Sequence, residues 1–194
     1  MADTVVKSGA TVLEDCQAAI GYRFNDLNLL RASLTHASGA DSRLSSNERL
    51  EFLGDAILGL VVCERLFTRF PEFLEGDLTK IKSVVVSRRT CAHISRQLKL
   101  EDYLIMGKGM NSAATFPASV LADVFESLVA AVYLDGGLDA ARRFVLHWLN
   151  PIVDRVAAEA HVGNYKSMLQ QVTQREFGET PRYLVVDEQG PDHN

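Results

Sequence analysis

The stretch that decides the fold is NERLEFLGDAILGL, residues 47–60. Its apolar residues recur closely enough for a helix that is buried on nearly all sides. Three acidic residues, Glu48, Glu51 and Asp55, nevertheless lie among them. Their spacing of i, i+3 and i+7 places the three carboxylates on one stripe of the helix. Because ionised side chains are rarely buried without a partner, this stripe either faces solvent or surrounds a group of opposite charge.

A second expected helix carries two more acids. Asp123 and Glu126 are i, i+3 neighbours inside the almost continuously apolar stretch 119–137, which contains no Lys or Arg. A bound cation would neutralise these carboxylates. Oxygen ligands without His or Cys favour a hard ion, so the pattern points to Mg²⁺, with Mn²⁺ as a substitute. Acids that simply face solvent remain the alternative at this stage.

Length and composition describe one domain with a substantial core, with room for a small appendage, because the chain has 194 residues and is 47% hydrophobic. Its longest apolar runs, 56–63 and 127–134, are much shorter than the ~20 residues that a membrane span needs. The first residues lack a basic start followed by an apolar stretch, so we expect a cytoplasmic protein that does not enter a membrane. Three widely spaced cysteines, Cys16, Cys63 and Cys91, fit reduced thiols better than disulfides or a zinc site.

The net charge of −5 argues weakly against nucleic acid as a partner, because proteins that bind polyanions usually carry a basic surface. That argument fails if the acids are gathered around a metal ion. The overall charge therefore excludes little.

Helical spacing dominates from about residue 10 to residue 160 and predicts an all-α domain. Ser45, three residues before Glu48, indicates a capping box, which would give Glu48 a purely structural role. The glycines of DGG (135–137) predict a break between helices. After residue 161 the pattern predicts a helix over 164–178 that ends at Gly178, followed by a strand over 183–186.

These segments resemble the ribonuclease III family, the endonucleases that cut double-stranded RNA. NERLEFLGDAIL (47–58) is similar to the family signature almost letter for letter. The resemblance continues through SLTHAS (33–38), FPEFLEGDLTKIKSVVVS (70–87), YLIMGKG (103–109) and LADVFESLVAAVYLDGG (121–137). Residues 164–194 are similar to the first part of a double-stranded-RNA-binding domain. The implied organisation is an all-α endonuclease domain over 8–160, a linker over 161–163, and a truncated α/β RNA-binding domain over 164–194 that holds only the first helix, the first strand and the following loop.

The resemblance also assigns roles to the acids. Glu51, Asp123 and Glu126 correspond to the family's metal ligands, and Asp55 corresponds to the acid named with Glu126 as catalytic. Two further residues, Glu48 and Glu75, correspond to acids of the same valley that help with RNA or a second metal. Capping and ordinary loop exposure remain the alternative explanations for these two.

Other residues are assigned to binding. Phe52 corresponds to the aromatic knob of the family's homodimer interface, although a Phe on such a helix is more often plain core. Gln170, Gln174 and His193 keep positions that in the family reach the RNA minor groove. A further residue, His36, lies in the SLTHAS segment, where a structural hydrogen-bonding role is the more common one for a lone His.

The implied activity is metal-dependent hydrolysis of double-stranded RNA by a homodimer, which leaves 5′-phosphate and 3′-hydroxyl ends and serves the maturation of rRNA precursors and mRNA. A catalytically inactive RNA-binding scaffold is the main alternative, but it requires a lost ligand and none is lost. An unrelated all-α metal hydrolase is a second alternative, but the similarity of residues 164–194 to an RNA-binding domain argues against it. The sequence departs from the family pattern at Met110, Pro117 and Ala118. None of these positions is a metal ligand, so the departures affect only how this loop binds RNA.

Overall fold

The computed structural model describes residues 9–107 and 116–184, which fall into two compact units that divide between Val156 and Ala157. Six α-helices make up most of the described chain: α1 (Gly9–Ile20), α2 (Leu27–Leu34), α3 (Glu48–Arg69), α4 (Glu75–Val85), α5 (Arg88–Gln97) and α6 (Ala118–Phe177). Single 3₁₀ turns lie at Ala37–Gly39, Arg43–Ser45 and Leu100–Asp102. In these residues the only β-type pairing is one isolated parallel bridge between Thr35 and Ile105. The prediction of an all-α domain over the first part of the chain is confirmed.

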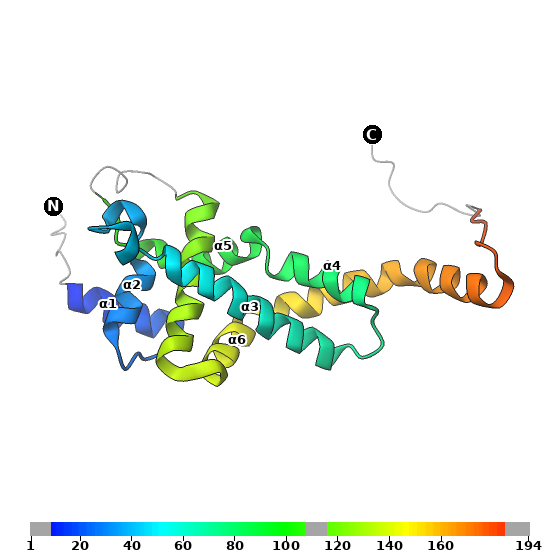
Figure 1. Ribbon diagram of the computed structural model, residues 1–194, viewed down its shortest axis with the longest axis horizontal. Helices are drawn as coiled ribbons and strands as arrows, with labels where there is room; N and C mark the ends of the chain where they lie inside the picture. Colours follow the sequence, from blue (N-terminus) through cyan, green and yellow to red (C-terminus); the bar gives the residue numbers. More distant parts are fainter. Residues whose placement is uncertain (1–8, 108–115, 185–194) are drawn as a thin grey trace, which may run out of the picture. The chain divides into compact units, whose positions relative to one another are not determined.

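The core of the first unit forms where α3 meets the first part of α6. Leu58 and Val62 of α3 and Phe125 and Leu128 of α6 are completely buried. Helix α4 packs against α3 and runs back along it after the connection that follows Arg69 (Figure 1). Glu48, Glu51 and Asp55 share one side of α3, whereas Glu64, nearer the end of the helix, is exposed and pairs with Arg142.

Helix α6 consists of two helices joined at Gly137, where a φ of 76° breaks the regular backbone. The chain turns sharply there, in the yellow-green part of the ribbon (Figure 1). Asp135 fixes this turn to the segment between α1 and α2. Its carboxylate accepts hydrogen bonds from the Tyr22 hydroxyl (2.8 Å) and from the backbone N–H groups of Asn25 (3.0 Å) and Asp26 (2.9 Å). The break expected at residues 135–137 is therefore confirmed.

The capping box expected at Ser45 is wrong. Ser45 ends a 3₁₀ turn, where its hydroxyl bonds back to Ser42, and Asn47 is the residue that precedes α3. The backbone of Asn47 is used in tertiary contacts, because its N–H donates to the Thr35 carbonyl (2.8 Å) and its carbonyl accepts from the Ser127 hydroxyl (3.2 Å). These contacts tie the start of α3 to α6 and set the chain's entry into the helix.

In the second unit, α6 extends through residues 161–163 and ends at Phe177. Gly178 follows with a φ of 70°, and its N–H donates to the Gln174 carbonyl, so the predicted end of this helix is confirmed. The strand predicted over 183–186 is absent at Tyr183 and Leu184, and residues 185–186 lie outside the described residues. A single strand has no neighbour to receive its backbone hydrogen bonds. An α/β domain is not formed by the described residues, and the domain limits remain predictions.

Two further properties concern the chain as a whole. Within the described ranges, no helix is both long and apolar enough to cross a membrane. The thiols of Cys16, Cys63 and Cys91 are unpaired, as the sequence predicts.

Candidate active site

The site is built on a very close approach of two helices at Gly54. A Cβ atom on this residue would lie 1.8 Å from the backbone carbonyl oxygen of Glu126, so only glycine allows α3 and α6 to cross at this distance. Gly54 lies between Glu51 and Asp55 in the sequence. The crossing therefore brings the acids of α3 to the part of α6 that carries Asp123 and Glu126.

The structure brings the three predicted metal ligands, Glu51, Asp123 and Glu126, near Asp55, the predicted catalytic partner of Glu126, and we call these four acids the carboxylate cluster. Burial raises the pKa of Glu51, and the negative charges of Asp123, Glu48 and Asp55 raise it further. Burial also raises the pKa of Asp123. These mutual effects show that the acids of the two helices lie within electrostatic reach of one another.

Glu126 is the most strongly perturbed of these acids. Burial, followed by the charges of Asp55, Asp123 and Glu51, raises its pKa from 4.5 to about 7. Ionising Glu126 near neutral pH therefore places a further negative charge where three already repel it. A cation within the cluster would reverse this penalty.

Within 9–107 and 116–184, no group of three or more His, Cys, Asp or Glu side chains already has the arrangement of a metal site. The acids raise one another's pKa values without forming a ready metal site. Like charges repel one another over longer distances than those that separate the ligands of one ion. Four carboxylates, with raised pKa values at three of them, suit a hard divalent cation and offer nothing to a soft one.

The two additional acids are placed differently. Glu48 begins α3 and forms a two-pronged hydrogen bond with Arg43, at 2.7 and 3.1 Å, which lowers its pKa. Its charge still contributes to the raised pKa of Glu51. Glu75 begins α4, where it accepts a hydrogen bond from the Thr79 hydroxyl (2.7 Å). The structure thus places Glu48 at the border of the cluster, whereas Glu75 has a local helix-terminal contact.

Phe52 is not a core residue, because 82% of it is exposed. Next to it lies a hollow of about 700 Å³. Its lining includes Leu29, Ala32, Leu44, Leu50, Leu53 and Leu134. An exposed aromatic ring beside an apolar hollow indicates a contact surface rather than ordinary packing.

The residues assigned to RNA in the second unit have few described contacts. Gln170 is partly exposed, and Gln174 is exposed and donates to the Gly178 carbonyl at 3.4 Å. His193 lies outside the described residues. His36 has a structural role, because its Nδ1 accepts a hydrogen bond from the Ser38 N–H (3.1 Å) and caps a 3₁₀ turn.

Sequence reasoning missed three residues of the site. Gly54 could have been noticed, because a glycine between two acids in an otherwise apolar helix often marks a close approach. Cys91 and Arg88 of α5 gave no signal. Burial, then the charges of Glu126 and Asp55, raises the pKa of Cys91 to about 12, and the Cys91 thiol donates a long hydrogen bond to the Val86 carbonyl (4.0 Å). The charge of Arg88 opposes the raised pKa values of Glu51, Asp123 and Glu126.

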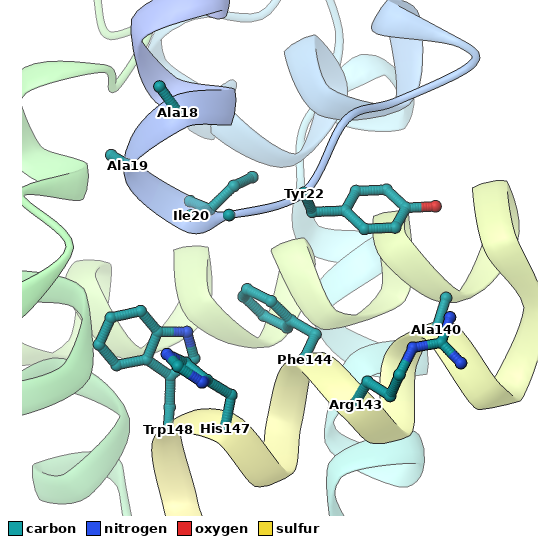
Figure 2. Close-up of a pocket in the computed structure, with 10 residues that line it drawn as sticks. Ala18, Ala19, Ile20, Tyr22, Ala140, Arg143, Phe144, His147 and Trp148 are labelled. Carbon is teal, nitrogen blue, oxygen red and sulfur yellow. The ribbon is translucent and has the colours of Figure 1, made fainter.

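A separate cavity of about 460 Å³ lies between the end of α1 and the second part of α6. Figure 2 shows Ile20 and Tyr22 above it, with Arg143, Phe144 and Trp148 on the α6 side. None of the described residues that line it is acidic. This cavity is therefore not a second version of the carboxylate cluster.

Comparison with known proteins gives consistent matches. A family profile described as Ribonuclease-III-like matches residues 26–153. A protein named ribonuclease 3 from Rhodopirellula baltica is 52% identical over 192 residues, which cover 99% of this chain and 70% of that protein. Ribonuclease 3 from Oleidesulfovibrio alaskensis is 45% identical over 94% of this chain and 81% of its own length. A solved nuclease domain of ribonuclease III from Campylobacter jejuni, described as flexible in a region involved in dimer formation, is 37% identical with a TM-score of 0.67. The match covers 72% of this chain and 96% of that domain.

Proposed function

The chain belongs to the ribonuclease III family, and we propose that its carboxylate cluster is the centre at which it hydrolyses double-stranded RNA. The chain is an endoribonuclease of RNA processing. The observation that carries the assignment of the centre is the crossing at Gly54, which joins the acids of two helices that are far apart in sequence. The products we expect carry 5′-phosphate and 3′-hydroxyl ends, and the expected substrates are precursors of rRNA and mRNA.

The family is metal-dependent, and we assign the ion of this chain as Mg²⁺, for which Mn²⁺ can substitute. Glu51, Asp123 and Glu126 would hold it, because they supply only oxygen ligands and have raised pKa values. A divalent ion held by these residues would supply activation of a water molecule and stabilisation of negative charge on the reacting phosphate. The negative charge of Asp55 is the largest charge contribution to the raised pKa of Glu126, so the two side chains lie near each other. Asp55 would orient the attacking water or take its proton.

The buried position of Glu126 matters for the chemistry. Because its pKa is about 7 without a cation, this carboxyl is partly protonated at neutral pH and needs a positive charge nearby to be fully ionised. The proposed site therefore couples ion binding to the release of a proton from Glu126. We expect activity to rise with pH across the range in which Mg²⁺ and protons compete for this group.

Cutting both strands requires a second copy of the site, and we assign Phe52 and the hollow beside it to the homodimer interface. The exposed ring of Phe52 and the exposed side chain of Leu44 lie at the border of the hollow. In a two-fold interface, Phe52 of each copy would fill the hollow of the other. Such a central aromatic anchor commonly supplies a large share of the binding free energy.

Recognition of the duplex rests on shape, phosphates and 2′-hydroxyls. Within the second unit we assign Gln170, Gln174 and His193 to contacts in the minor groove. Glu48 and Glu75 are assigned to RNA or to a second ion at the edge of the cluster. The inactive scaffold is disfavoured because all four acids of the carboxylate cluster are present.

The test is cleavage of a long RNA duplex in Mg²⁺ by the parent chain and by Glu126→Gln, with product length and end chemistry as readouts. The amide keeps the shape of the side chain but is a weaker ligand, so cleavage should be lost while duplex binding persists. Glu14→Gln serves as the control, because Glu14 is an exposed acid on α1. Near-normal cleavage by Glu126→Gln would refute the assignment of the centre.

A further inference from the structure

Arg88 occupies a fixed place at the start of α5. Ser87 precedes it as the helix cap, where the Ser87 hydroxyl accepts from the Thr90 N–H (3.2 Å), and the Thr90 hydroxyl donates to the Val84 carbonyl (2.7 Å). These contacts hold the turn between α4 and α5. The backbone of Arg88 is therefore well defined although its side chain is exposed.

One stripe of α5 faces the carboxylate cluster. Arg88, Cys91 and Ser95 are spaced i, i+3 and i+7, which places them on one side of the helix. Cys91 is completely buried, and the charges of Glu126 and Asp55 contribute to the raised pKa of its thiol, while the Ser95 hydroxyl donates to the Leu121 carbonyl. Glu126 and Leu121 both belong to α6. Arg88 is the exposed end of the same stripe.

The positive charge of Arg88 acts on the acids of the carboxylate cluster, but its guanidinium pairs directly with none of them. It lowers the pKa of Glu51, Asp123 and Glu126 against the larger effect of their burial. Yet among the described residues its guanidinium forms neither an ion pair nor a hydrogen bond. A structural arginine would normally satisfy its donors on a nearby carboxylate.

We propose that Arg88 binds a phosphate group of the RNA next to the bond that is cut, and so positions the duplex over the carboxylate cluster. The guanidinium presents a planar fork of donors that fits phosphate oxygens in pairs. Its place on the rim of an acidic site gives the approaching polyanion a local positive contact where the acids would otherwise repel it. The proposal rests on the function proposed above.

The experiment compares Arg88→Gln, Arg88→Lys and Arg89→Gln in the full chain. Arg89 is the matched control, because it is exposed, adjacent and carries the same charge at the same helix end, but points about 100° away around the helix. Steady-state cleavage of a defined duplex gives kcat and KM at several Mg²⁺ concentrations. Binding of the same duplex is measured against salt concentration in the Glu126→Gln background, and thermal unfolding checks the fold.

Arg88→Gln should raise KM roughly tenfold, as expected for the loss of a charged hydrogen bond. The slope of log affinity against log salt should become shallower by about one for each lost phosphate contact. Arg88→Lys should keep that slope while losing part of the affinity, because it retains the charge but not the fork. Arg89→Gln should match the parent chain.

Equal losses in Arg88→Gln and Arg89→Gln would overturn the proposal, because net charge alone would then be responsible. An unchanged KM with a lower Mg²⁺ requirement in Arg88→Gln would also overturn it. Arg88 would then only balance the charge of the acids. Failure of the parent chain to cut any duplex in Mg²⁺ would instead refute the proposed function and is recognised before any Arg88 variant is made.

Discussion

Replacing Gly54 by alanine tests whether the close crossing of α3 and α6 creates the active site. The added Cβ would lie 1.8 Å from the Glu126 carbonyl oxygen and 2.5 Å from its carbonyl carbon. Both atoms belong to the backbone, so no side chain can rotate away to make room. Restoring an ordinary contact of at least 3.4 Å requires the helices to separate locally by roughly 1.6 Å.

This separation should affect stability and catalysis to different extents. Overpacking of a core usually costs about 1–3 kcal/mol, which lowers the Tm of a domain of this size by about 2–12 °C. Displacing catalytic groups by about 1 Å commonly reduces rates by roughly 100-fold. We therefore expect Gly54→Ala to remain folded at 25 °C while losing about two orders of magnitude in kcat/KM.

Gly59→Ala is the matched control on the same helix. Its Cβ would meet only the Lys82 side chain, at 4.0 Å, and alanine is the better helix former by roughly 0.5–1 kcal/mol. It should keep full activity and unfold at the same or a slightly higher temperature. Duplex cleavage and thermal unfolding of the two variants decide the matter. Parent-like cleavage and Tm in Gly54→Ala would refute the reasoning.

Burial and the neighbouring acids raise the pKa of Glu126 to about 7, above its unfolded value of 4.5, so the metal-free fold should lose stability as pH rises between these values. In EDTA the Tm of the parent chain should therefore fall relative to Glu126→Gln over this range, and a constant difference would contradict the burial argument. Asp135→Asn should lower stability by about 1–2 kcal/mol in denaturant unfolding, because it weakens the charge-assisted bonds that hold the α6 turn, and an unchanged midpoint would refute this. Phe52→Ala should shift sedimentation at micromolar concentration toward the monomer, whereas Phe177→Ala, which removes another exposed ring, should not; equal behaviour of the two would count against the assigned interface. Deleting residues 163–194 should barely change cleavage, because this segment has three basic and five acidic residues and so releases few counterions from a duplex; a large loss of affinity would show that it binds RNA as it stands.

The sequence was sufficient to predict the helical fold, because helical spacing is a local property. The acids of the carboxylate cluster lie on two helices, so grouping them required the family resemblance, and their roles remain predictions. The i, i+3, i+7 stripe of α3 and the i, i+3 pair of α6 are local patterns that the folded chain preserves. The family resemblance then assigned chemistry to the acids. The break in α6 at Gly137 was also predicted by the glycines of the DGG segment.

What the sequence did not predict depends on contacts between distant segments. The start of α3 differs from the expected capping box because Asn47 is held by Thr35 and Ser127, which lie 12 and 80 residues away. The expected strand near Tyr183 is absent in the described residues, since a strand is stabilised by neighbours rather than by its own composition. Arg88 gave no signal because an arginine at a helix start is usually a solvated charge.

The crossing at Gly54 explains why stability and ion binding should be linked in this chain. It partly buries Glu126 and places it near three other acids, so without a cation the fold must protonate Glu126 or accept repulsion among four negative charges. A bound divalent ion relieves both penalties in the folded state, while the unfolded chain has no such cluster. Mg²⁺ should therefore raise the Tm most at a pH above 7, where Glu126 is ionised, and least near pH 5. The arrangement that makes the metal-free fold less stable is thus the same one that gives the ion its binding free energy.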